Sequence, residues 1–140
     1  MFKLENKIKN KKYGIEISII KEEINRSKRF DYFFSVLAVE VSHSVPRGLS
    51  RVIPGKVISF HLMEKFLRGY DKMLGPFWRR YFIILPQTGR EGADSVKQRI
   101  NRLARKHNWG VVSIGMAVYP GDCKSSIALL DKAISNLSKS

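Results

Sequence analysis

The sequence has a single cysteine, Cys123, and no apolar run that approaches the length of a membrane span. One thiol excludes an internal disulfide and any metal site built from several cysteines, and it fits a reducing compartment. Lysines interrupt the few apolar residues at the N-terminus, so no signal peptide is predicted. We therefore expect a soluble, cytoplasmic protein.

Acidic side chains are also scarce. There are 12 aspartates and glutamates against 26 lysines and arginines, which gives a formal net charge of +14. Such a chain attracts polyanions, whether nucleotides, nucleic acid or an anionic membrane surface. The histidines, His43, His61 and His107, have no spacing typical of a metal site. Composition therefore indicates an anionic partner without naming one.

The chain is too short for two domains. Its 140 residues, 44% of them hydrophobic, suit one compact unit with a real core. No internal repeat or low-complexity segment is present. We expect a single domain over residues 1–140, with residues 1–13 forming a basic N-terminal lead-in.

Apolar periodicity alternates between helix and strand along the chain. Gly69 is placed to cap one helix, and Thr88 and Glu91 have the spacing of a capping box ahead of another. Helices are predicted over residues 14–29, 56–68 and 125–137, and a further helix carries Ala93, Val96, Ile100 and Leu103 on its apolar face. Strands are predicted over 33–41, 81–86 and 109–120, with a short extra strand around Met73 and Leu74. This order predicts an α/β fold.

Three stretches of sequence carry a family resemblance. "EINRSKRFDYFFSVLAVEV" is followed by "RRYFIILP" ahead of a helix and by "SIGMAVYP" after it. In this order and spacing they resemble the GGDEF domains, which are the diguanylate cyclases that condense two GTP into cyclic di-GMP. The resemblance extends from about Asn10 to Ser140. The resemblance implies a nucleotidyl cyclase-like palm with a mixed central β-sheet flanked by helices.

The family's five-residue signature is replaced. Its Gly-Gly-Asp-Glu-Phe positions correspond to Phe77, Trp78, Arg79, Arg80 and Tyr81. In an active cyclase the acidic residues of this turn bind metal, and a hard cation needs oxygen ligands. Arginines would repel the cation, so we expect no metal, no magnesium cofactor and no catalytic residue at this turn.

Other positions of the cyclase site have changed as well. By the same alignment the metal-binding aspartate of the first strand corresponds to Glu40, and a nearby acidic position corresponds to Ser42. A guanine-reading aspartate falls at or near Lys56. One remaining carboxylate cannot hold two ions, so we expect that the chain is not an enzyme.

A second family site is retained. Many members bind cyclic di-GMP at an inhibitory Arg-x-x-Asp that lies five residues before the signature, and Arg68 and Asp71 have this spacing. A further arginine of that site corresponds to Arg99. A guanidinium can donate two hydrogen bonds to O6 and N7 of guanine, and a carboxylate can accept from N1 and N2. The ligand-binding prediction is Arg68, Asp71 and Arg99.

Three functions are open at this point. The leading one is a non-catalytic cyclic di-GMP receptor that signals through a protein partner, or through a homodimer that the ligand holds together. The second is a protein-interaction scaffold without nucleotide binding, in which the Arg-x-x-Asp is an ordinary surface ion pair. The third and least favoured is a nucleic-acid-binding domain, because the recognised motifs are missing. The partner and the pathway cannot be read from the sequence.

Overall fold

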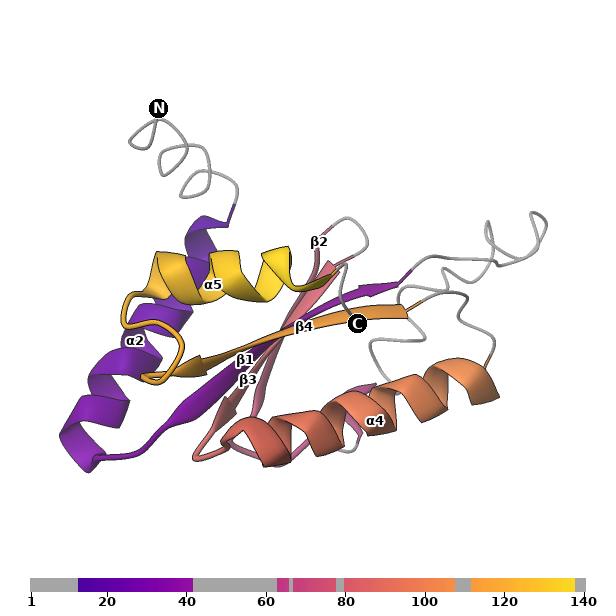
Figure 1. Ribbon diagram of the computed structural model, residues 1–140, viewed down its shortest axis with the longest axis horizontal. Coiled ribbons are helices and arrows are strands. Elements are labelled where there is room, and N and C mark those ends of the chain that lie inside the picture. The colour runs from indigo at the N-terminus through magenta and orange to yellow at the C-terminus, as the bar shows by residue number, and fades with distance from the viewer. Residues whose placement is uncertain (1–12, 42–62, 66, 78–79, 108–111, 138–140) are drawn as a thin grey trace.

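The computed structural model describes residues 13–41, 63–65, 67–77, 80–107 and 112–137. Helices and strands follow one another in the predicted order (Figure 1). Of the helix predicted over residues 56–68, Met63 and Glu64 are helical, and its earlier residues lie outside the described part. The helices are α2 (Gly14–Phe30), α4 (Arg90–Lys106) and α5 (Ser126–Ser135); the strands are β1 (Phe34–Val41), β2 (Lys72–Phe77), β3 (Arg80–Pro86) and β4 (Val112–Tyr119).

The strands form one sheet in the order β2-β3-β1-β4. The predicted fold class is confirmed. A mixed sheet was expected, and every pairing among the described strands is antiparallel. The reason is the topology. The connection from β1 to β2 and the one from β3 to β4 each skip one strand position, and the skipped position is filled by a strand of opposite direction. β1 and β2 run in the same direction, as do β3 and β4, but the two strands of each pair are never neighbours.

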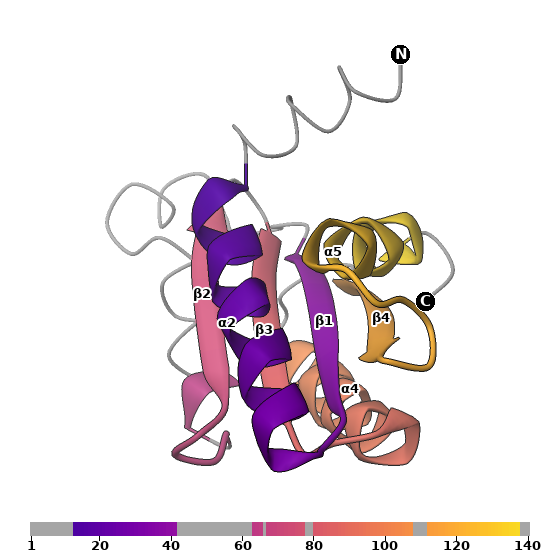
Figure 2. The same cartoon turned by 90° about the vertical axis from the view of Figure 1, so that its left-hand side faces the viewer.

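The sheet separates two helical layers (Figure 2). Phe34, Val36 and Ala38 of β1 pack in the core beneath α2 and α5. Leu37 and Val39, which alternate with them, pack in the core beneath α4. Because side chains of a strand alternate between faces, a strand covered on both faces reads as one continuous apolar run, as β1 does.

The contact between α5 and β4 is unusually close at Gly115. A Cβ atom added there would lie 1.9 Å from the carbonyl oxygen of Ala133 and 2.9 Å from the backbone nitrogen of Leu137. Glycine is therefore required at this position for α5 to lie on the sheet as it does. Among the described helices none is long and apolar enough to cross a membrane.

Candidate functional site

A cavity of about 640 Å³ lies where the end of β3 leads into the start of α4. All three residues of the predicted ligand site, Arg68, Asp71 and Arg99, line this cavity. They come from the turn before β2 and from the third turn of α4. The fold therefore brings Asp71 and Arg99 to one cavity although 27 residues lie between them in the sequence. The remaining walls are residues 33, 67, 87–92, 95 and 96.

Arg68 and Asp71 form a tight pair within one turn. The backbone N–H of Asp71 donates to the carbonyl oxygen of Arg68 at 3.0 Å. In return, Asp71 Oδ2 accepts from the backbone N–H of Arg68 at 2.8 Å and from its Nε at 3.2 Å, and Oδ1 accepts from Nη2 at 3.1 Å. The Asp71 side chain is only 3% exposed, whereas the Arg68 side chain is 44% exposed.

This geometry corrects the expected helix ending. Arg68 is not the last residue of a helix, and Gly69 is not a left-handed helix cap, because its φ is not positive. Gly69 instead occupies an inner position of the turn that closes between Arg68 and Asp71. The carboxylate of Asp71 holds this turn by accepting the Arg68 N–H, as Asp side chains often bond the backbone in turns.

The Arg68 guanidinium is held in place by further contacts. Its Nη2 donates to Oγ1 of Thr88 at 2.5 Å and to the carbonyl oxygen of Pro86 at 3.3 Å. Its carbon Cζ lies 4.5 Å from the centre of the Tyr70 ring, a cation–π contact. The hydrogen bond with Asp71 raises the pKa of Arg68 above its ordinary value, so the group stays charged.

The capping-box prediction for Thr88 was wrong. α4 begins after Gly89, and no side chain caps its first turn. The Thr88 hydroxyl donates to the carbonyl oxygen of Pro86 at 3.0 Å and accepts from Arg68, so it is not available to the helix. Thr88 thus bonds the distant guanidinium of Arg68 in place of the nearby backbone of α4.

Arg90 is a cavity residue that the sequence did not single out. It is mostly exposed at the first position of α4, and its Nη2 donates to both carboxylate oxygens of Asp122 at 2.8 Å. Burial acts to raise the pKa of Asp122, but the hydrogen bond from the Val118 N–H and the Arg90 guanidinium outweigh it, so this pKa is lowered. The pair fixes the start of α4 to the loop between β4 and α5.

Of the turn that replaces the family signature, the structure describes Phe77, Arg80 and Tyr81. Arg80 opposes Glu40 across β3 and β1, and its Nε lies 3.7 Å from Oε2 of that glutamate. Its Nη1 also donates to the hydroxyl of Tyr13 at 2.9 Å, while Tyr81 is buried. Phe77 ends β2. Within the described residues, no group of three or more His, Cys, Asp or Glu side chains is placed to hold a metal ion.

Several predicted positions lie outside the described residues. These are Trp78 and Arg79 of the turn, Ser42 and Lys56, the histidines His43 and His61, and the basic lead-in up to residue 12. Phe33 and Thr88 are cavity residues that sequence reasoning did not assign to the site. The period of two along β1 could have placed Phe33 on the face of the sheet that α4 covers, but no local signal marks Thr88 as the partner of Arg68.

Comparison with known proteins shows what fold the chain has. No family model matches the chain, and neither does any curated protein. Among solved structures, the GGDEF domain of TpbB (YfiN) from Pseudomonas aeruginosa superposes with a TM-score of 0.74 at 13% identity, over 90% of this chain and 81% of that one.

Two further structures agree. The GGDEF domain of DgcB from Caulobacter crescentus, in complex with cyclic di-GMP, has a TM-score of 0.70 at 11% identity over 88% of this chain and 78% of its own. The diguanylate cyclase SiaD, in complex with its activator SiaC from Pseudomonas aeruginosa, has a TM-score of 0.71 at 19% identity over 88% of this chain and 52% of its own. The chain therefore has the fold of a GGDEF domain.

Proposed function

We propose that this chain is a non-catalytic receptor that binds cyclic di-GMP in the cavity lined by Arg68, Asp71 and Arg99. The observation that carries the proposal is the convergence of these three side chains on one cavity of a GGDEF fold. The cavity volume, about 640 Å³, falls within the range usual for small-molecule sites. The DgcB structure, which has the same fold, contains cyclic di-GMP.

The paired turn has the donors and acceptors that guanine recognition needs. A guanidinium can donate hydrogen bonds to O6 and N7 of guanine, and the Arg68 side chain remains almost half exposed beside the cavity. Its Nε and Nη2 are engaged by Asp71, Pro86 and Thr88, whereas its Nη1 makes no hydrogen bond within the described residues. Asp71 is an acceptor-only group whose side chain is 3% exposed and whose oxygens already accept three hydrogen bonds from Arg68. About one acceptor site is therefore left, and it can receive one hydrogen from N1 or N2 of the base. The mutual hydrogen bonds of the two residues hold both in position before a ligand arrives.

The surroundings of the pair suit the two phosphates of the ligand. Arg90 and Arg99 both line the cavity. The first turn of α4 also lines it without a side-chain cap, and backbone N–H groups at a helix N-terminus favour anions. A dianionic ligand would thus meet positive charge around a base-reading turn.

The absence of catalysis is the second part of the proposal. Glu40, which corresponds to a metal-binding aspartate of the cyclases, is paired with the Arg80 guanidinium instead. A fixed cation beside that carboxylate opposes the approach of a divalent metal ion. The receptor would pass its signal to a protein partner. Association with another protein has a precedent among chains of this fold, since the diguanylate cyclase SiaD forms a complex with its activator SiaC.

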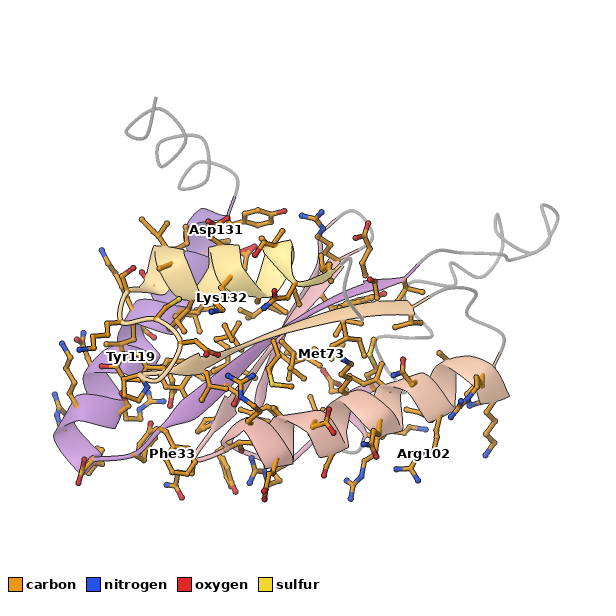
Figure 3. All side chains as sticks on the ribbon, viewed as in Figure 1. Phe33, Met73, Arg102, Tyr119, Asp131 and Lys132 are labelled. Atoms are coloured by element: carbon orange, nitrogen blue, oxygen red, sulfur yellow. The ribbon has the colours of Figure 1, made fainter. Side chains whose placement is uncertain are left out.

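Isothermal calorimetry with purified protein tests the binding. We expect binding of cyclic di-GMP and rejection of cyclic di-AMP, which has the same charge. Arg99 and Arg102 form a matched pair for mutation, because both are exposed on α4 and neither makes a hydrogen bond or ion pair within the described residues, yet only Arg99 lines the cavity. Arg102 lies on the side of α4 away from the sheet (Figure 3).

Arg99→Ala should weaken binding by on the order of 1–3 kcal/mol, about tenfold to a hundredfold. Arg102→Ala removes the same charge and should leave the affinity within a factor of about two. Equal losses in the two variants would indicate general electrostatic attraction rather than a site. If the unmodified chain binds no cyclic di-GMP at high micromolar concentration, the receptor proposal fails and the scaffold takes its place.

The same preparation, incubated with GTP and magnesium or manganese, should form no cyclic di-GMP. Product above a protein-free control would overturn the non-catalytic part of the proposal and leave the binding part standing.

A further inference from the structure

Phe33 stands out as a large apolar side chain that is exposed at the cavity. It is 51% exposed, and it is the one aromatic residue among the described residues that line the cavity. The alternation of β1 places it there. Leu37 faces the α4 layer and Ser35 donates a hydrogen bond to the carbonyl oxygen of Thr88, so Phe33 continues the same row beyond the end of the sheet.

The corner that presents Phe33 is well fixed. α2 ends at Asp31 in the left-handed conformation, and the backbone N–H groups of Asp31 and Tyr32 both donate to the carbonyl oxygen of Ser27. The Tyr32 hydroxyl donates to the buried carboxylate of Glu23. Burial, together with that hydrogen bond, raises the pKa of Tyr32 to about 12, so its hydroxyl remains a donor at neutral pH.

The Phe33 ring itself rests against the start of α4. Its Cε2 atom lies 3.3 Å from the point where a Cβ atom on Gly89 would be. The ring thus has one side against the backbone of the helix N-cap while half of it remains open. In Figure 3 its side chain lies between the end of α2 and the first turn of α4. An exposed aromatic held by its neighbours is a surface on which a flat ligand can stack.

We propose that Phe33 is a stacking platform for one guanine base of the ligand, which rests on the receptor function proposed above. Arg68 and Asp71 contact a base only at its edge and leave its flat faces to be covered. Phe33 lines the same cavity and supplies an apolar aromatic face. Edge reading gives the choice of guanine, whereas stacking on Phe33 adds affinity that does not depend on the base.

Substitutions at Phe33 separate stacking from packing. By calorimetry, Phe33→Ala should bind cyclic di-GMP about fivefold to a hundredfold more weakly. Phe33→Leu should lose a comparable amount, because leucine fills the space without an aromatic face, and Phe33→Trp should bind as well as the parent or better. Phe30→Ala is the matched control. Phe30 is 65% exposed three residues earlier but does not line the cavity, so this variant should bind normally.

Fluorescence gives a second measurement that a purely structural role would not affect. In Phe33→Trp the added indole emission should be quenched as cyclic di-GMP is titrated, after subtraction of the parent signal from Trp78 and Trp109. Phe30→Trp should show no added quenching. This measurement also covers the case in which Phe33→Ala does not fold.

The outcomes distinguish the two proposals. Three results would overturn the stacking proposal alone, provided that the parent chain binds cyclic di-GMP. These are unchanged binding by Phe33→Ala, full retention of binding by Phe33→Leu, and no quenching in Phe33→Trp. Absence of any binding by the parent chain overturns the receptor function and the platform together.

Discussion

At the residue scale, two explanations of ligand binding in the cavity predict opposite effects when Asp71 is replaced by asparagine. The side chain is buried and accepts from both the backbone and the guanidinium of Arg68. If the cavity attracts the ligand only through charge, removing one negative charge should tighten binding. If Asp71 holds Arg68 in position and accepts a hydrogen bond from guanine, the same change should weaken binding, because an amide can present a donor where the carboxylate presented an acceptor.

We expect Asp71→Asn to weaken the binding of cyclic di-GMP by on the order of 1–3 kcal/mol and to reduce the preference over cyclic di-AMP. Calorimetry with both dinucleotides measures this. Asp94→Asn makes the same change of charge on α4 outside the cavity, where Asp94 accepts from Gln98 at 3.0 Å. Tighter binding by Asp71→Asn, matched by Asp94→Asn, would favour the charge-only explanation.

At the scale of elements, the packing of α5 against β4 requires a glycine at position 115, because the backbone of α5 comes close to its Cα. Its added Cβ would overlap the backbone of Ala133, which cannot give way as the end of a flexible side chain can. Overpacking of this kind typically costs 1–3 kcal/mol and at times more. We therefore expect Gly115→Ala to lower the free energy of unfolding by about 3 kcal/mol.

Urea denaturation followed by circular dichroism measures the change. Gly121→Ala is the control, since a Cβ atom there meets nothing within 4 Å and the residue does not have positive φ. It should change stability by no more than about 0.5 kcal/mol. Equal stabilities for the two variants would mean that α5 can move away from the sheet at little cost.

At the scale of the whole molecule, the net charge of +14 opposes close association of two copies. Arg99 adds to this repulsion at the cavity, because it has no acidic partner within the described residues, whereas cyclic di-GMP brings two phosphates per molecule to the same place. We expect a monomer or a weak dimer that shifts towards dimer when the ligand is added, with the shift decreasing as salt screens the charges.

Sedimentation velocity at two salt concentrations, with and without saturating cyclic di-GMP, measures this shift. The Arg99→Ala variant should show a smaller shift at equal ligand concentration. An unchanged mass in the presence of bound ligand would rule out a ligand-held dimer and would direct attention to a different protein as the partner.

Local properties of the sequence account for the kinds of element and for part of the ligand-site prediction. Helix and strand follow from apolar periodicity, which is a local property, and so α2, β1 and β3 appear close to their predicted bounds. The pairing of Arg68 with Asp71 is also local, since three positions separate them. Arg99 was placed by resemblance alone, through its fixed offset along the chain.

Contacts between residues far apart in sequence could be found only from the folded structure. The antiparallel directions follow from crossovers that each skip a strand, and no periodicity within one strand encodes that choice. Thr88 has the spacing of a helix cap, yet it bonds Arg68, 20 positions away, because the turn before β2 folds against the end of β3. Arg80 meets Glu40 only through strand register. Local free energies fix elements, whereas such contacts exist only once packing has fixed the positions of whole elements.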